Sequence, residues 1–157
     1  MKKLKYVKLF ENFSTQTFYH GSSVKLRIGT ILEPQLEFYT RRSDVQFLEK
    51  IMYAYRPDDK LSRYDSVFLV DNIDDIDSSG GYTDFIYEVS ILDVIIPEKS
   101  DLAWYTELEL IESDDYDKQK EIAGNYWNGV RYHKRSESLF EYRVPKARVV
   151  ELVEDGY

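Results

Sequence analysis

The stretch Phe18-Tyr19-His20-Gly21-Ser22-Ser23, with Leu26, Gly29, Leu32 and Pro34 behind it, is the most informative part of the chain. Its first residues predict a β-strand from Thr17 to Gly21, because aromatic and β-branched residues favour strands and glycine interrupts them. A histidine at the end of a strand can form a hydrogen bond with a ligand hydroxyl, and the glycine behind it lets a ligand approach the backbone closely. A structural histidine beside a turn is the alternative interpretation of the same residues.

Two helices and several strands are predicted outside this stretch. Apolar residues recur at three- and four-residue steps between Arg41 and Tyr55, which predicts a helix that Pro57 ends. Residues 116–127 predict a second helix, with Gly129 as its stop signal. Residues 104–111 fit a strand or a short helix equally well. Apolar runs predict further strands at 66–70, 85–91, 139–143 and 148–153, the last two separated by Pro145. This mixture, without an internal repeat, indicates a single α/β or α+β domain.

The composition narrows the classes of function. The chain has 157 residues, 43% of them hydrophobic, which is enough for one domain with a core. With 21 basic and 29 acidic residues and a formal charge of -8, we expect no general nucleic-acid-binding face, since such a face is basic. The absence of cysteine excludes disulfides and thiolate metal sites, and two histidines argue against a zinc enzyme. No apolar run suggests a signal peptide or a membrane span, so we expect a cytoplasmic protein.

Familiar catalytic and metal-binding motifs are missing or incomplete. Asp75-x-Asp77-x-Ser79-Gly80 matches the opening of an EF-hand loop, but its twelfth position is Ile86 instead of a bidentate glutamate. A solvated loop is therefore the favoured interpretation, and no metal is expected. No Gly-x-Ser-x-Gly elbow, Walker loop or dinucleotide Gly-x-Gly-x-x-Gly motif occurs.

The Tyr-His-Gly-Ser run and the leucine, glycine and proline behind it resemble the first strand of the ADP-ribosyltransferase superfamily. The resemblance is closest to the small rifampin-modifying branch, and the layout is also similar to uncharacterised phage-encoded proteins of this fold. Short motifs extend the resemblance from residue 17 to residue 152. They are Val67-Phe68-Leu69-Val70 with Asp74-Asp75-Ile76, then Ile86-Tyr87-Glu88-Val89, and finally Glu141-Tyr142-Arg143 with Ala147-x-Val149-Val150.

This resemblance implies an ADP-ribosyltransferase-like split of two small, mostly antiparallel sheets with flanking helices, which binds NAD in the cleft between them. Residues 1–157 would form a single domain, with a lead-in segment at 1–16 and the core at 17–152. The protein would use NAD as a substrate and, if phage-encoded, would act in the host cytoplasm.

The resemblance also implies roles for individual residues. His20 would hold the ribose of NAD, with Tyr19, Gly21 and Ser22 beside it. Phe68 stands where the family usually has tyrosine, so its ring can stack on nicotinamide but lacks the hydroxyl. Glu141, which opens a strand after the loop at 128–138, would stabilise the ribosyl oxocarbenium ion as nicotinamide leaves.

Other carboxylates are alternatives for the acid. The rifampin-modifying branch uses an aspartate earlier in the chain, in the neighbourhood of Glu98 and Asp101 here. Glu107-x-Glu109 is similar to the two-glutamate motif of other branches. For each of these four residues an ordinary surface carboxylate is the favoured interpretation.

A positive charge for the pyrophosphate is expected just before the Phe68 strand, where Arg56 and Arg63 flank a turn. Arg63 is the predicted ligand, because a guanidinium can bind phosphate oxygens in a bidentate manner. A salt bridge to one of the many acidic residues is the alternative.

These features together predict an NAD-dependent ADP-ribosyltransferase-like protein that cleaves the nicotinamide–ribose bond. It would transfer ADP-ribose to a protein, a nucleic acid or a small molecule. Two alternatives stay open. One is a catalytically inactive relative with the same fold, and the other is an acidic phage-type protein that acts as a protein-binding or inhibitory module.

Overall fold

The chain folds into two antiparallel sheets and a set of helices. A computed structural model describes residues 16–35, 43–134 and 138–156, so nearly all of the expected lead-in segment lies outside the described residues. The strands are β1 (Phe18–Ser22), β2 (Ile31–Leu32), β3 (Val67–Leu69), β4 (Phe85–Ile91), β5 (Glu98–Asp101), β6 (Phe140–Val144) and β7 (Ala147–Asp155). The α-helices are α3 (Ser43–Ala54), α4 (Asp75–Ser78), α5 (Ala103–Glu109) and α6 (Tyr116–Trp127), and a 3-10 turn, η1, spans Arg63–Asp65. In the described residues the protein is thus α+β with two antiparallel sheets, as predicted, and it has four α-helices where the sequence predicted two and left a third segment undecided.

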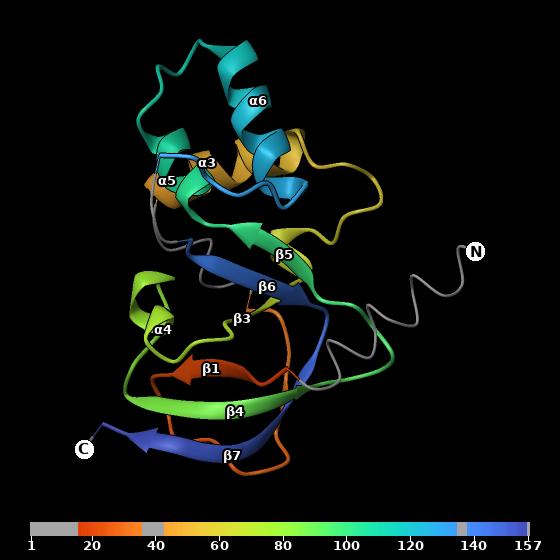
Figure 1. The fold of residues 1–157 in the computed structure, drawn as a ribbon, viewed down its shortest axis with the longest axis vertical. Helices are drawn as coiled ribbons and strands as arrows, with labels where there is room; N and C mark the ends of the chain where they lie inside the picture. Colours follow the sequence, from red (N-terminus) through yellow and green to blue (C-terminus); the bar gives the residue numbers. More distant parts are fainter. Residues whose placement is uncertain (1–15, 36–42, 135–137, 157) are drawn as a thin grey trace.

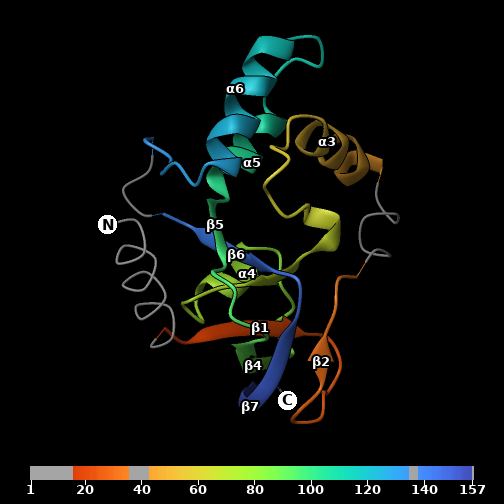
Figure 2. The same ribbon diagram turned by 90° about the vertical axis from the view of Figure 1, so that its right-hand side faces the viewer.

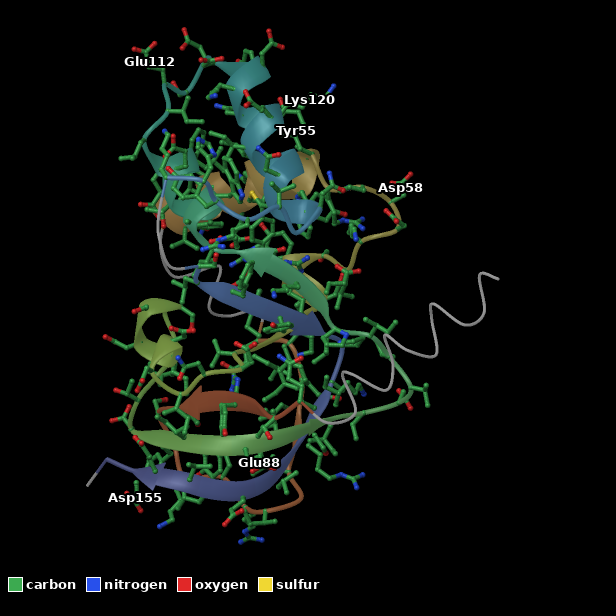
Figure 3. All side chains as sticks on the ribbon, viewed as in Figure 1. Tyr55, Asp58, Glu88, Glu112, Lys120 and Asp155 are labelled. Atoms are coloured by element: carbon green, nitrogen blue, oxygen red, sulfur yellow. The ribbon has the colours of Figure 1, made fainter. Side chains whose placement is uncertain are left out.

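The sheets and helices form successive layers (Figure 1). Sheet A has the strand order β1-β4-β7-β2, and sheet B has the order β3-β6-β5. Helices α3, α5 and α6 gather beyond sheet B, at the end of the molecule opposite sheet A (Figures 1 and 2). The charged side chains of Asp58, Glu112, Lys120 and Asp155 lie exposed on the outer surface (Figure 3).

The two sheets are joined at one edge by backbone hydrogen bonds. Tyr19 of β1 donates to the carbonyl of Val70, just after β3, over 2.8 Å, and the N–H of Val70 donates back over 3.1 Å. Side chains of both sheets pack in the space between them, with Phe18 and Tyr87 from sheet A against Tyr142 from sheet B. This seam brings the start of β1 beside β3, although some fifty residues separate them in the chain.

A second connection runs through the Val144–Ala147 corner. The chain leaves sheet B at the end of β6 and enters sheet A with β7, and Pro145 lies between the two strands. Proline has no N–H to donate and so interrupts a ladder of strand hydrogen bonds. The predicted break at Pro145 is confirmed, and it is the point where the chain crosses from sheet B to sheet A.

The helical layer has its own apolar core. Leu48 and Met52 of α3 pack with Ile122 and Trp127 of α6, as the three- and four-residue spacing predicted. The Trp127 indole donates to the carbonyl of Met52 over 2.9 Å, which satisfies a buried N–H. The Asp115 carboxylate accepts from the N–H of Lys118 at the start of α6. Gly129, at φ +66°, follows its end as predicted.

Several elements differ from or refine the prediction. Strand β1 does not stop at Gly21 but continues to Ser22. Residues 103–109 form helix α5, which decides between the two alternatives for that segment. Strand β5 was not predicted, because Glu98-Lys99-Ser100-Asp101 has no apolar or β-branched residue; its pairing with β6 overrides this low propensity.

Within the residues that the structure describes, no helix combines the length and apolarity needed to cross a lipid bilayer.

Candidate functional site

A pocket of about 490 Å³ lies between the two sheets. This volume is within the range of small-molecule sites. Strands β1 and β3, Glu141 of β6, the 3-10 turn, the segment 30–35 that contains β2, and the loop at 79–82 line it. All seven residues predicted for the site contribute to its wall, namely Tyr19, His20, Gly21, Ser22, Arg63, Phe68 and Glu141.

His20 lies in the middle of β1 and is held by the backbone of β3. Its Nδ1 is 3.0 Å from the carbonyl oxygen of Phe68. Because a carbonyl oxygen only accepts, we place the proton on Nδ1, which leaves Nε2 as an acceptor. Burial lowers the pKa of His20, partly offset by this hydrogen bond. No described residue bonds Nε2, so a neutral imidazole presents an acceptor to the pocket.

Phe68 presents its ring to the pocket from the middle of β3. The guanidinium of Arg63 lies 4.6 Å from the centre of this ring, in a cation–π contact. The ring is half-buried, which leaves part of it in contact with the pocket space.

Glu141 is the second residue of β6, and its side chain is only 3% exposed. Its Oε1 accepts hydrogen bonds from Nη1 of Arg63 and from the hydroxyl of Tyr126. None of the described residues donates to Oε2, so this oxygen stays available to a ligand in the pocket. An anionic oxygen at this position can stabilise positive charge that develops on a bound molecule.

Arg63 has two carboxylate partners. In addition to Glu141, its Nε donates to Oε1 of Glu49 over 2.8 Å. The predicted pyrophosphate contact of Arg63 stays a prediction, and the alternative of a salt bridge is what the structure contains. Arg56 does not line the pocket; its guanidinium donates to the backbone carbonyls of Pro57 and Lys60.

A second arginine, Arg143 of β6, extends this buried network. It is 1% exposed, and its Nη1 donates to Ser100 over 2.7 Å and to the Tyr126 hydroxyl over 2.8 Å. Its Nη2 forms an ion pair with Glu98 at 3.2 Å. Burial raises the pKa of Tyr126, so its hydroxyl keeps its proton and can donate to Glu141.

Sequence reasoning missed Glu49, Tyr126 and Arg143 as members of this network. For Glu49 a signal exists, because position 49 falls four residues after Val45 and three before Met52, on the apolar face of α3. A carboxylate on such a face needs a buried cation as its partner.

The four alternative carboxylates do not line the pocket. Asp101 is buried and accepts from the backbone N–H groups of Ala103 and Tyr132 over 3.1 and 2.9 Å. Glu98 accepts from the N–H of Leu61 as well as from Arg143. Glu107 pairs with Lys134 on the helical layer, and Glu109 ends α5 on the surface. The favoured surface interpretation is therefore wrong for Asp101, whose role is to cap buried backbone.

Gly21 and Ser22, which follow His20, have structural roles. A Cβ on Gly21 would lie 1.8 Å from the carbonyl oxygen of Tyr82, so the loop at 79–82, and not a ligand, occupies the side-chain space of this glycine. The expected reason for Gly21 is thereby corrected, although its backbone lines the pocket. The Ser22 hydroxyl donates to the carbonyl of Val24 over 2.8 Å, and Tyr19 packs against Val70 and Ile76.

The incomplete EF-hand motif does not form a loop. Asp75 and Asp77 lie in the short helix α4, with Ile76 buried beneath them. Among the described residues, no group of three or more histidine, aspartate or glutamate side chains is arranged to hold a metal ion.

No protein-family model matches this chain, and no curated protein sequence matches it significantly.

Proposed function

We propose that the chain is an NAD-dependent ADP-ribosyltransferase, which cleaves the nicotinamide–ribose bond and passes ADP-ribose to an acceptor. One observation supports this most directly. His20, Phe68 and Glu141, which belong to three different strands, line a single pocket between two antiparallel sheets. A hydrogen-bond acceptor, an aromatic ring and a carboxylate around one space are the groups that this reaction needs.

Each group has a defined part in the proposed reaction. Nε2 of His20 accepts a hydrogen bond from a ribose hydroxyl and orients the sugar. The ring of Phe68 stacks on nicotinamide. The bond between the ribose and the ring nitrogen breaks with its electron pair going to nicotinamide, which leaves as a neutral molecule.

The positive charge then rests on the ribose, beside the carboxylate of Glu141. A nucleophilic atom of the acceptor forms the new bond to the ribose and releases its proton. Because Glu141 is almost fully buried, its attraction for this cation is less screened by water than that of a surface carboxylate.

The pyrophosphate needs a cation besides Arg63, which already has two carboxylate partners. We assign this task to Lys25 and Arg27, exposed on either side of Leu26, which itself lines the pocket. Lys25 forms an exposed pair with Asp155 at 3.3 Å and lies 5.9 Å from the ring centre of Phe85, and a phosphate can replace the exposed pair.

The test is nicotinamide release from NAD by the purified protein, with and without host lysate as a source of acceptor. Wild type is compared with His20→Ala and Glu141→Gln. Glu107→Gln is the matched control, since it also removes one carboxylate from an ion pair but lies outside the pocket. Release that is lost in the first two variants and kept in the control supports the proposal.

Two other outcomes select the alternatives. Binding of NAD, seen as a thermal shift, without release of nicotinamide indicates a catalytically inactive relative. If the protein neither binds NAD nor releases nicotinamide, the proposal is overturned and the acidic protein-binding module is the remaining alternative.

A further inference from the structure

The guanidinium of Arg63 connects carboxylates from two different layers of the fold. Glu49 belongs to helix α3 and Glu141 to strand β6, and the two residues are 1% and 3% exposed. Nε of Arg63 binds one carboxylate and Nη1 binds the other. Arg63 therefore links the helical layer to the one candidate acid that lines the pocket.

Aromatic side chains hold this arrangement in one geometry. The guanidinium lies 4.6 Å from the ring centre of Phe68 and 4.7 Å from that of Tyr105. The Tyr105 hydroxyl donates to Oε1 of Glu49 over 3.1 Å. The ring centre of Tyr126 lies 5.4 Å from the guanidinium as well. A guanidinium confined by three rings and two acids has little freedom to turn, so its fork sets the orientation of both carboxylates.

The charges of this group do not cancel. Among the described residues, the one cation Arg63 pairs with these two carboxylates, which leaves one negative charge in a buried setting. Oε2 of Glu49 is buried and has no hydrogen-bond partner, so no described donor offsets the charge from that side. If Arg63 bound Glu141 alone, the pair would be neutral and would attract a cationic ribose only weakly.

We propose that Arg63 and Glu49 are positioning residues for Glu141: Arg63 orients the carboxylate so that Oε2 meets the ligand, and Glu49 keeps the assembly negatively charged. This inference rests on the proposed function. Helix α3, which lies outside the pocket, would then take part in the reaction through an ion pair and not through contact with the substrate.

The test separates the maximal rate from binding. Glu49→Gln keeps the size of the side chain and an acceptor oxygen for Arg63 and Tyr105, but removes the charge. We expect kcat for nicotinamide release to fall on the order of tenfold, with KM for NAD within about twofold, because only charge stabilisation in the transition state is reduced.

Arg63→Lys should lower kcat in the same direction, since an ammonium is a point charge and cannot reproduce the fork between Glu49 and Glu141. Glu107→Gln is again the matched control and should retain wild-type kcat. If Glu49→Gln does not fold, Tyr105→Phe takes its place: it keeps the ring on Arg63, removes the hydrogen bond to Glu49, and should lower kcat several-fold.

The outcomes distinguish this inference from the proposed function. A wild type that releases nicotinamide, with Glu49→Gln at the same kcat but a lower melting temperature, shows a structural ion pair and overturns the inference alone. A rise in KM with kcat unchanged also overturns it. A wild type that neither binds NAD nor releases nicotinamide removes the proposed function and this inference with it.

Discussion

Gly21 is the residue at which one added methyl group should have the largest effect. Substitution by alanine places a Cβ 1.8 Å from the carbonyl oxygen of Tyr82 and 2.8 Å from Cγ2 of Ile76. Both neighbours belong to the segment from α4 to the loop at 79–82, which forms one wall of the pocket. A carbonyl of the main chain cannot turn away as a flexible side chain can, so the loop itself has to move by more than an ångström.

The size of the effect follows from the cost of overpacking. Inserting a methyl group into a packed site typically costs 1–3 kcal/mol, and the backbone contact here places Gly21→Ala at about 3 kcal/mol. For a domain of this length, each kcal/mol lowers the melting temperature by roughly 2–4 °C, which gives a decrease of about 6–12 °C. Because the displaced loop lines the pocket, affinity for a ligand in the pocket should fall as well.

The assay is thermal and urea unfolding of Gly21→Ala beside Gly124→Ala. Gly124 lies in α6, and outside its chain neighbours and the nearby backbone of its own helix no atom lies within 4 Å of an added Cβ, so the same substitution should stabilise the protein by about 0.4–1 kcal/mol there. Opposite signs for the two variants are the expected result. A free energy of unfolding for Gly21→Ala within about 0.5 kcal/mol of wild type, the usual range for a neutral surface change, would refute the packing argument.

Three further predictions concern buried polar groups. Burial lowers the pKa of His20 below the unfolded value of about 6.5. Between the folded pKa and about pH 6.5, the unfolded chain therefore binds a proton at His20 that the folded chain does not. The free energy of unfolding consequently decreases as pH falls from about 6.5 towards the folded pKa. His20→Asn should abolish that part of the pH dependence, which urea unfolding at pH 7 and pH 5 measures. Asp101→Asn leaves one of two backbone N–H groups without its acceptor and should cost about 1–3 kcal/mol in urea unfolding, whereas no loss would contradict the capping role. Arg143→Met removes one hydrogen-bond donor from each of the hydroxyls of Ser100 and Tyr126, which keep their other partners, and it removes the ion-pair partner of Glu98. This should lower the free energy of unfolding by about 3 kcal/mol, whereas a gain in stability would show that apolar packing is preferred there.

The elements with a clear apolar period could be predicted from the sequence, and the others could not. Val45, Leu48 and Met52 mark one face of α3, and the run from Phe85 to Ile91 forms β4 with the predicted bounds. Strand β5 escaped prediction because pairing with β6, and not its own residues, makes it a strand. The residues of β5 alone do not indicate that β6 pairs with them.

The candidate site shows the same division. His20 was recognisable beside a glycine, and Phe68 and Glu141 were assigned through resemblance to a family. That these side chains meet depends on the Tyr19–Val70 seam, which is a contact between distant segments. Glu49 was missed for a related reason: a glutamate in a helix is ordinarily exposed, and only the position of Arg63 in space makes this one a partner.

The acceptor that orients His20 belongs to the main chain, and this has a consequence for how the pocket can change. The imidazole is aligned by the carbonyl of residue 68, while the side chain of the same residue forms part of the pocket wall. A different ring at position 68 would keep the alignment of His20, because every residue type has that carbonyl. The two tasks of one residue can thus be altered independently, and ligand preference at this wall can be redesigned without rebuilding the histidine.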